Sequence, residues 1–142
     1  MDYITNAVDD LVTKYDTNDP FVLADCLGLI VEEFPFRSTK GLIINLDRYY
    51  IPISAHLPYN MKRAAVAHEI GHYVLSNPNS GYFFISEFTL FETKVEAEAN
   101  KFMIHLLTYG TSPEQDESLV YYSRRVGVPL EIIQRYYKDI IQ

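Results

Sequence analysis

The 142-residue chain lacks several features of exported and membrane proteins. It has one cysteine, Cys26, so an internal disulfide is excluded and a reducing compartment is expected. No apolar run approaches the ~20 residues that a transmembrane helix needs. The first residues, Met1 to Asn6, lack the basic and apolar segments of a secretory signal. These absences predict a cytoplasmic protein. Cys26 itself is expected in the core, because buried thiols commonly behave as small hydrophobes.

Positive charge is also scarce. The chain has 19 acidic residues against 12 basic ones, for a net charge of −7, and no basic run is longer than two residues. Nucleic-acid affinity comes largely from lysine and arginine at phosphates. Direct nucleic-acid binding is therefore not expected, whereas a protein partner is.

The length and the hydrophobic content of 48% predict one globular domain spanning residues 1–142. Apolar spacing and proline positions predict helices over 2–16, 20–27, 61–75 (with Asn60 as N-cap) and 90–107. Two further helices are predicted to begin at 112–115 and at 129.

Runs of branched and aromatic residues predict strands at 30–34, 41–46 and 49–53. Pro52 favours an edge position for the last of these strands, because proline has no N–H for the ladder. The predicted fold class is therefore α+β, with helices packed around a small, mostly antiparallel, three-stranded sheet. The aromatic segment at 82–88 fits either a strand or a flap.

The sequence His68-Glu69-Ile70-Gly71-His72 has the spacing H-E-x-x-H. Residues four apart lie on the same face of a helix, so both imidazoles can point at one metal ion. Glu69 can then reach the water bound to that ion. The flanking residues are apolar nearly all round, which predicts a buried helix, and buried charged groups need partners. The motif therefore predicts a catalytic zinc site, with metal-free core histidines as the alternative.

A catalytic zinc generally takes three protein ligands and leaves a fourth position for water. The sequence offers Glu92, Glu96 and Glu98 as the third ligand, and periodicity does not separate Glu96 from Glu98. Asn100 lies four residues after Glu96, where its amide can support a metal ligand from behind. We therefore predict Glu96 as the third ligand and Asn100 as a residue that supports a metal ligand through a hydrogen bond. The alternative role for Glu96 is a capping box with Thr93.

Peptide hydrolysis also needs a group that stabilises the oxyanion. Tyr73 is a possible oxyanion stabiliser, with Tyr59 and His56 as further candidates, and each also fits a structural role. His105 is predicted to be structural. The segment at 81–88 is predicted to receive an extended substrate peptide as an edge strand.

Two stretches resemble the ImmA/IrrE family of bacterial and phage metallopeptidases. They are A-H-E-I-G-H-Y at 67–73, after the lead-in P-Y-N-M-K-R, and E-A-E-A-N-K-F at 96–102, followed by a Leu-Leu pair. A weaker match lies at 126–129, and the resemblance covers roughly half the chain, from Asn60 to the end. H-E-x-x-H alone is shared by many families. Its combination with E-x-x-x-N at this spacing is much more specific. The segment 103–105, M-I-H, departs from the small residues common in the family.

The resemblance implies a zincin-like fold in which His68, His72 and Glu96 match the family's zinc ligands and Glu69 matches its catalytic glutamate. Family members are known for cutting a helix-turn-helix repressor and so releasing genes of mobile elements or stress responses. The resemblance therefore implies a zinc endopeptidase with a separate repressor-type protein as substrate. The alternatives are a non-proteolytic, zinc-containing antirepressor that holds its partner, and a metal-free interaction module.

Overall fold

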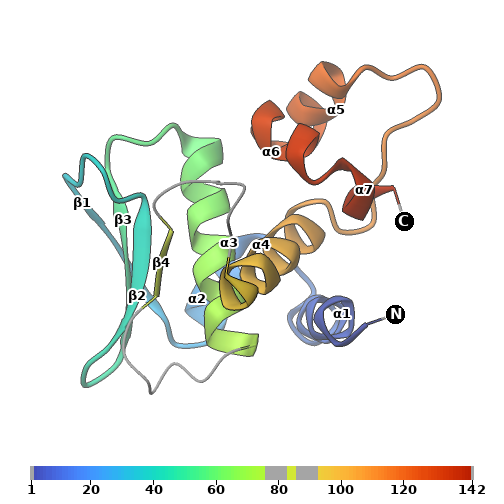
Figure 1. Ribbon diagram of the computed structural model, residues 1–142. Helices are drawn as coiled ribbons and strands as arrows, with labels where there is room; N and C mark the ends of the chain where they lie inside the picture. The colour runs from blue at the N-terminus through green and yellow to red at the C-terminus, as the bar shows by residue number, and fades with distance from the viewer. Residues whose placement is uncertain (1, 76–82, 86–92, 142) are drawn as a thin grey trace.

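The structure, a computed structural model, describes residues 2–75, 83–85 and 93–141 (Figure 1). Its helices are α1 Tyr3–Tyr15, α2 Pro20–Cys26, α3 Tyr59–Leu75, α4 Lys94–Leu107, α5 Leu119–Val126, α6 Leu130–Arg135 and α7 Tyr137–Ile140. Its strands are β1 Ile30–Phe34, β2 Gly41–Asn45, β3 Tyr49–Ser54 and β4 Phe83–Ile85. The predicted α+β class is confirmed. Within the described ranges, every helix is too short or too polar to cross a membrane.

The sheet has the strand order β1-β3-β2-β4. β2 pairs antiparallel with both β3 and β4, whereas β1 pairs parallel with β3. The three predicted strands all form and the sheet is mostly antiparallel, as predicted. The predicted number of strands was one too low, because β4 extends the sheet beyond β2. β4 lies within the aromatic segment at 82–88, whose remaining residues lie outside the described part of the chain.

Pro52 lies on the central strand β3, so its predicted edge position was wrong. Between β2 and β3, Gly41 pairs with Ile53 and the next pair is Ile44 with Tyr50, so Pro52 does not pair with β2. A proline without an N–H is tolerated in the middle of a sheet where the ladder is interrupted in this way.

The N-terminal helices begin as the sequence predicts. Asp19 caps α2 by accepting hydrogen bonds from the backbone N–H groups of Phe21 and Val22. The buried residues of α2 are Pro20, Leu23 and Ala24. Cys26 lies off this stripe and is exposed, so its predicted place in the core was wrong.

Helix α3 lies between the sheet and α4 (Figure 1). It begins at Tyr59, so Asn60 lies in its first turn and is not the N-cap. Every residue from Ala64 to His72 is buried, as the apolar surroundings of the motif predict. The metal motif therefore lies on the most enclosed helix of the described chain, held from both sides by the core.

Gly71 allows α3 and α4 to approach each other closely. A Cβ atom at Gly71 would lie 3.1 Å from Cβ and Cδ1 of Phe102 and 3.2 Å from the backbone oxygen of Ala99. These distances are shorter than ordinary van der Waals contacts, and neither the Cβ atom nor the carbonyl oxygen can rotate away. The glycine within the motif thus sets the spacing of the two helices.

Gly71→Ala is expected to lower the free energy of unfolding by about 1 kcal/mol. Overpacking costs about 1–3 kcal/mol, and the better helix propensity of alanine offsets about 1 kcal/mol of that cost. Urea denaturation checks the effect. Adding Phe102→Leu, which removes the Cδ1 ring contact, should make Gly71→Ala less costly than it is in the wild-type background. A Gly71→Ala protein as stable as the wild type would show that the helices can move apart freely.

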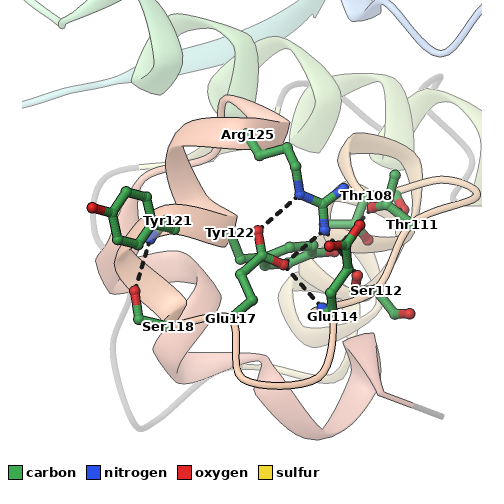
Figure 2. Close-up of polar contacts among 9 residues, drawn as sticks. All are labelled: Thr108, Thr111, Ser112, Glu114, Glu117, Ser118, Tyr121, Tyr122 and Arg125. Carbon is green, nitrogen blue, oxygen red and sulfur yellow. Dashed lines mark hydrogen bonds and ion pairs between the residues drawn. The ribbon is translucent and has the colours of Figure 1, made fainter.

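The C-terminal region differs from prediction in two places. Residues 112–115 do not begin a helix; α5 starts at Leu119, with Oγ of Ser118 accepting the N–H of Tyr121 at 3.2 Å. The preceding loop is held by the carboxylate of Glu117, which accepts the N–H of Glu114 and two hydrogen bonds from Arg125, all at 2.9 Å (Figure 2). The helix predicted from residue 129 is divided at Tyr136 into α6 and α7.

Glu117→Gln should change the pH dependence of stability. The hydrogen bonds from Arg125 and then from the N–H of Glu114 lower the pKa of Glu117 from 4.5 to about 2. A carboxylate with a lowered folded-state pKa stabilises the fold above its unfolded pKa, and this stabilisation disappears as the pH falls towards 2. The wild type should therefore exceed Glu117→Gln in stability above pH ~4.5, and the two should converge near pH 2. Denaturation across this range tests this, with Glu114→Gln as the matched control; a constant difference would contradict it.

Arg63 joins α3 to the C-terminal region. Its Nη1 donates hydrogen bonds to the carbonyl oxygens of Gly127 at 2.5 Å and of Val126 at 3.4 Å, at the C-terminal end of α5. Gly127 has a φ of 68°, and a Cβ there would lie 2.8 Å from the same Nη1 atom. The left-handed backbone favours glycine at this position, and a Cβ there would also displace the guanidinium.

Candidate metal centre

Helix α3 supplies two of the three converging side chains. His68 and His72 are fully buried, and their Nε2 atoms lie 3.0 Å apart. The rings meet edge to face, with centroids 4.6 Å apart and an interplanar angle of 81°. Their spacing of four residues places them one turn apart on the same face, as the motif predicts. Glu69, between them in sequence, is also fully buried.

Helix α4 supplies the third side chain, Glu96. Its Oε1 lies 2.6 Å from Nε2 of His72, and its Oε2 lies 3.2 Å from Nε2 of His68. Thr93 caps α4 by accepting the backbone N–H of Glu96 at 3.2 Å, so half of the predicted capping box forms. The carboxylate itself faces the histidines.

The described residues contain one group of three or more metal-binding side chains, formed by His68, His72 and Glu96. Glu98, the alternative third ligand, is half-buried and does not join this group. Glu92, the other alternative, lies outside the described residues.

Asn100 lies behind His68, one turn after Glu96 on α4. It is buried, and its Oδ1 lies 2.7 Å from Nδ1 of His68. An amide oxygen accepts hydrogen bonds, so the ring proton of His68 is held on Nδ1 and the lone pair of Nε2 points towards Glu96. This is the tautomer that a metal-binding Nε2 requires.

Burial and charge together set the ionisation of the group. Burial raises the pKa of Glu96, but the two neighbouring histidines outweigh this effect and lower the pKa to about 2. Burial lowers the pKa of His72, against the opposing effect of Glu96. A carboxylate that stays ionised and an imidazole that stays neutral are the forms in which these groups bind metals.

The donor set fits zinc. Zinc bonds of about 2.0–2.1 Å at tetrahedral angles place two ligand atoms about 3.3 Å apart. One ligand atom from each of the three side chains lies within 4.8 Å of the other two, so a single ion can reach all three. Two imidazole nitrogens and one carboxylate oxygen are ligands that zinc takes in catalytic sites, with a fourth position left for water. The buried lone pairs of His68 and the carboxylate of Glu96 converge on a position that a cation would stabilise.

The other predicted site residues lie elsewhere. The ring of Tyr73 packs edge to face against Tyr49 of β3, with centroids 5.1 Å apart, and its oxyanion role stays a prediction. Tyr59 stacks on Phe21, more than two turns of α3 before His68. His105 lines a separate cavity of about 460 Å³, together with residues of α1 and α7.

An H-E-x-x-H helix whose two buried histidines meet a half-buried glutamate from a neighbouring helix is an arrangement typical of zinc metallopeptidases. A peptidase M78 family model, described as the IrrE N-terminal-like domain, matches residues 24–136. The chain belongs to this family. The match starts well before Asn60, where the sequence motifs begin. The chain is also 33% identical over 107 residues to "uncharacterized immunity region protein 2" of Bacillus phage phi105, an alignment that covers 73% of this chain and 67% of the relative.

Proposed function

We propose that this chain is a zinc-dependent endopeptidase that cuts a separate helix-turn-helix repressor-type protein in the cytoplasm. The observation that carries the proposal is the contact of Glu96 with both histidines of the H-E-x-x-H helix. Membership of a peptidase family supports it, and the phage relative named for an immunity region supports a role in controlling genes of a phage or mobile element.

His68, His72 and Glu96 would hold the zinc, and Asn100 would keep His68 in the binding tautomer. Zinc, when bound, lowers the pKa of its water towards about 7 and polarises the scissile carbonyl. Glu69 would act as the general base, taking a proton from the attacking water and passing it to the leaving amine. Tyr73 is retained as the proposed oxyanion stabiliser.

The substrate would bind as an extended strand beside β4. This strand pairs with β2 on one side and forms an edge of the sheet, and it contacts α3, which carries the motif. An extended peptide can add to such an edge through main-chain hydrogen bonds. Introducing a charge into β4, for example Phe84→Asp, should slow cleavage of the repressor without releasing zinc. Unchanged cleavage would exclude this binding mode.

The proposal is tested by incubating the zinc-loaded protein with helix-turn-helix repressors from the same genome. Mass spectrometry should find one new pair of fragments, which disappears after chelation and returns when zinc is restored. A stable complex with an intact repressor would instead support the non-proteolytic, zinc-containing antirepressor. If neither fragments nor a complex were found, both of these functions would be overturned.

A further inference from the structure

The outer face of the sheet is unusually apolar. The helices pack on the opposite face, where Ile43, Ile51 and Ile53 are buried (Figure 1). A mostly antiparallel sheet with one face in water normally carries polar side chains on that face. Here the outer face carries Ile44 and Tyr50 instead, so both faces have the composition of a covered sheet.

This face is also hollowed. A groove of about 400 Å³ lies across β1, β2 and β3, and we call it the outer-sheet groove. Its lining residues are Glu32, Phe34, Phe36, Ile44, Leu46, Tyr50 and Pro52. Leu46 is 67% exposed and Phe34 is 40% exposed, which is costly for large apolar side chains unless a partner covers them.

One wall of the outer-sheet groove is fixed in place. The rings of Phe34 and Phe36 stack with centroids 5.7 Å apart. Their backbone is anchored, because the carbonyl of Phe34 accepts the N–H of Ala55 at 2.7 Å and the carbonyl of Phe36 accepts the hydroxyl of Ser54 at 2.6 Å. A rigid apolar wall loses little conformational entropy when a partner binds to it.

Acidic groups lie along the outer-sheet groove. The hydroxyl of Tyr50 donates to Oδ1 of Asp47 at 3.2 Å, and Glu32 is itself a lining residue. Arg48, a basic residue, opposes the effect of these acids on the Tyr50 hydroxyl. Because Asp47 and Glu32 both lie close to this hydroxyl and the chain carries a net charge of −7, the groove favours a basic occupant. A second copy of the chain would bring the same acidic groups and be repelled.

We propose that the outer-sheet groove docks a segment of a protein partner in which an apolar side chain stands beside lysine or arginine. The apolar side chain would fill the hollow between Phe34 and Leu46, and the basic group would lie near Glu32 and Asp47. The identification of this partner with the repressor substrate rests on the proposed function. Docking itself does not.

The test uses the full-length Glu69→Gln protein, so that bound peptides are not cut. Two 12-residue peptides share a Phe-Leu centre; one is flanked by lysines and the other by glutamates. Methyl NMR titration should show the lysine peptide binding at least about 10-fold more tightly, with shifts at Ile44 and Leu46 and an affinity that falls with salt. Leu46→Asn should weaken this binding by about 10-fold. Val22→Asn, at an apolar site on α2 with 46% exposure, is the matched control and should not weaken it.

Several results would overturn the proposal. Equal affinity for the two peptides would remove the charge preference, and shifts confined to residues outside the groove would place binding elsewhere. Failure of both peptides to bind would leave the groove without the proposed chemistry. Self-association that Leu46→Asn abolishes would make a second copy the occupant. Cleavage of the repressor by the wild-type protein tests the proposed function separately, because peptide docking is measured without hydrolysis.

Discussion

Replacing Glu69 with glutamine is expected to abolish most cleavage while leaving the zinc content unchanged. Glutamine fills nearly the same volume at this fully buried position, so the fold should persist. Its amide cannot accept a proton from the attacking water, and loss of a general base typically costs 10²–10⁴-fold in rate, about 3–5 kcal/mol in activation free energy. Repressor cleavage and elemental analysis, measured on one preparation, check the two parts of this prediction, and repressor affinity shows whether the substrate still binds.

The matched control is Glu98→Gln, which makes the same chemical change at a half-buried position on α4 outside the His-His-Glu group. The Glu98→Gln protein should cleave the repressor at the wild-type rate. Full activity in Glu69→Gln would remove Glu69 from the mechanism. Equal repressor binding by both variants and the wild type, with no cleavage by any of them, would identify a binding protein.

Replacing Glu96 with alanine should reduce zinc affinity by more than about 100-fold, because it removes one of the three proposed ligands. The two histidines would remain close together, without the carboxylate that lies 2.6 Å from His72 and 3.2 Å from His68. The protein purified with about one zinc per chain should therefore lose it on dialysis. Elemental analysis and competition with a zinc indicator measure the change, with His68→Ala as the positive control for loss.

Two further substitutions on α4 show whether the loss of zinc is specific to Glu96. Asn100→Ala removes the acceptor of the Nδ1 proton of His68 and should weaken zinc binding by about 10–100-fold. Glu98→Ala should leave it unchanged. Zinc retained in Glu96→Ala but lost in Glu98→Ala or Glu92→Ala would reassign the third ligand.

The sequence predicted which side chains come together at the candidate site because the motif's spacing is local. Two histidines four apart on a helix must share a face, whatever the helix packs against. Asn100 distinguished Glu96 from Glu98 because it follows Glu96 by one turn, and the structure places both side chains beside His68. Strand positions were equally readable, since runs of branched residues mark them without reference to the partner strand.

Features that depend on distant contacts were not predictable in this way. The parallel pairing of β1 with β3 and the central place of β3 depend on how separate segments meet. The helix start predicted at 112–115 failed because Glu117 turns to Arg125, eight residues away. The tight contact of Gly71 with Phe102 was also missed. Its only signal was a glycine inside a helical motif, a residue that costs about 1 kcal/mol there and so needs a reason.

The contacts of the Arg63 guanidinium limit how far this domain can be shortened for expression. Its two acceptors, the carbonyls of Val126 and Gly127, lie far along the chain from α3 and belong to a region without metal ligands. A shortened version ending after α4 would keep His68, His72 and Glu96 but leave a half-buried arginine on α3 without these acceptors. The segment that contains Val126 and Gly127 therefore supports the helix of the H-E-x-x-H motif, and a fragment for expression must extend past Gly127.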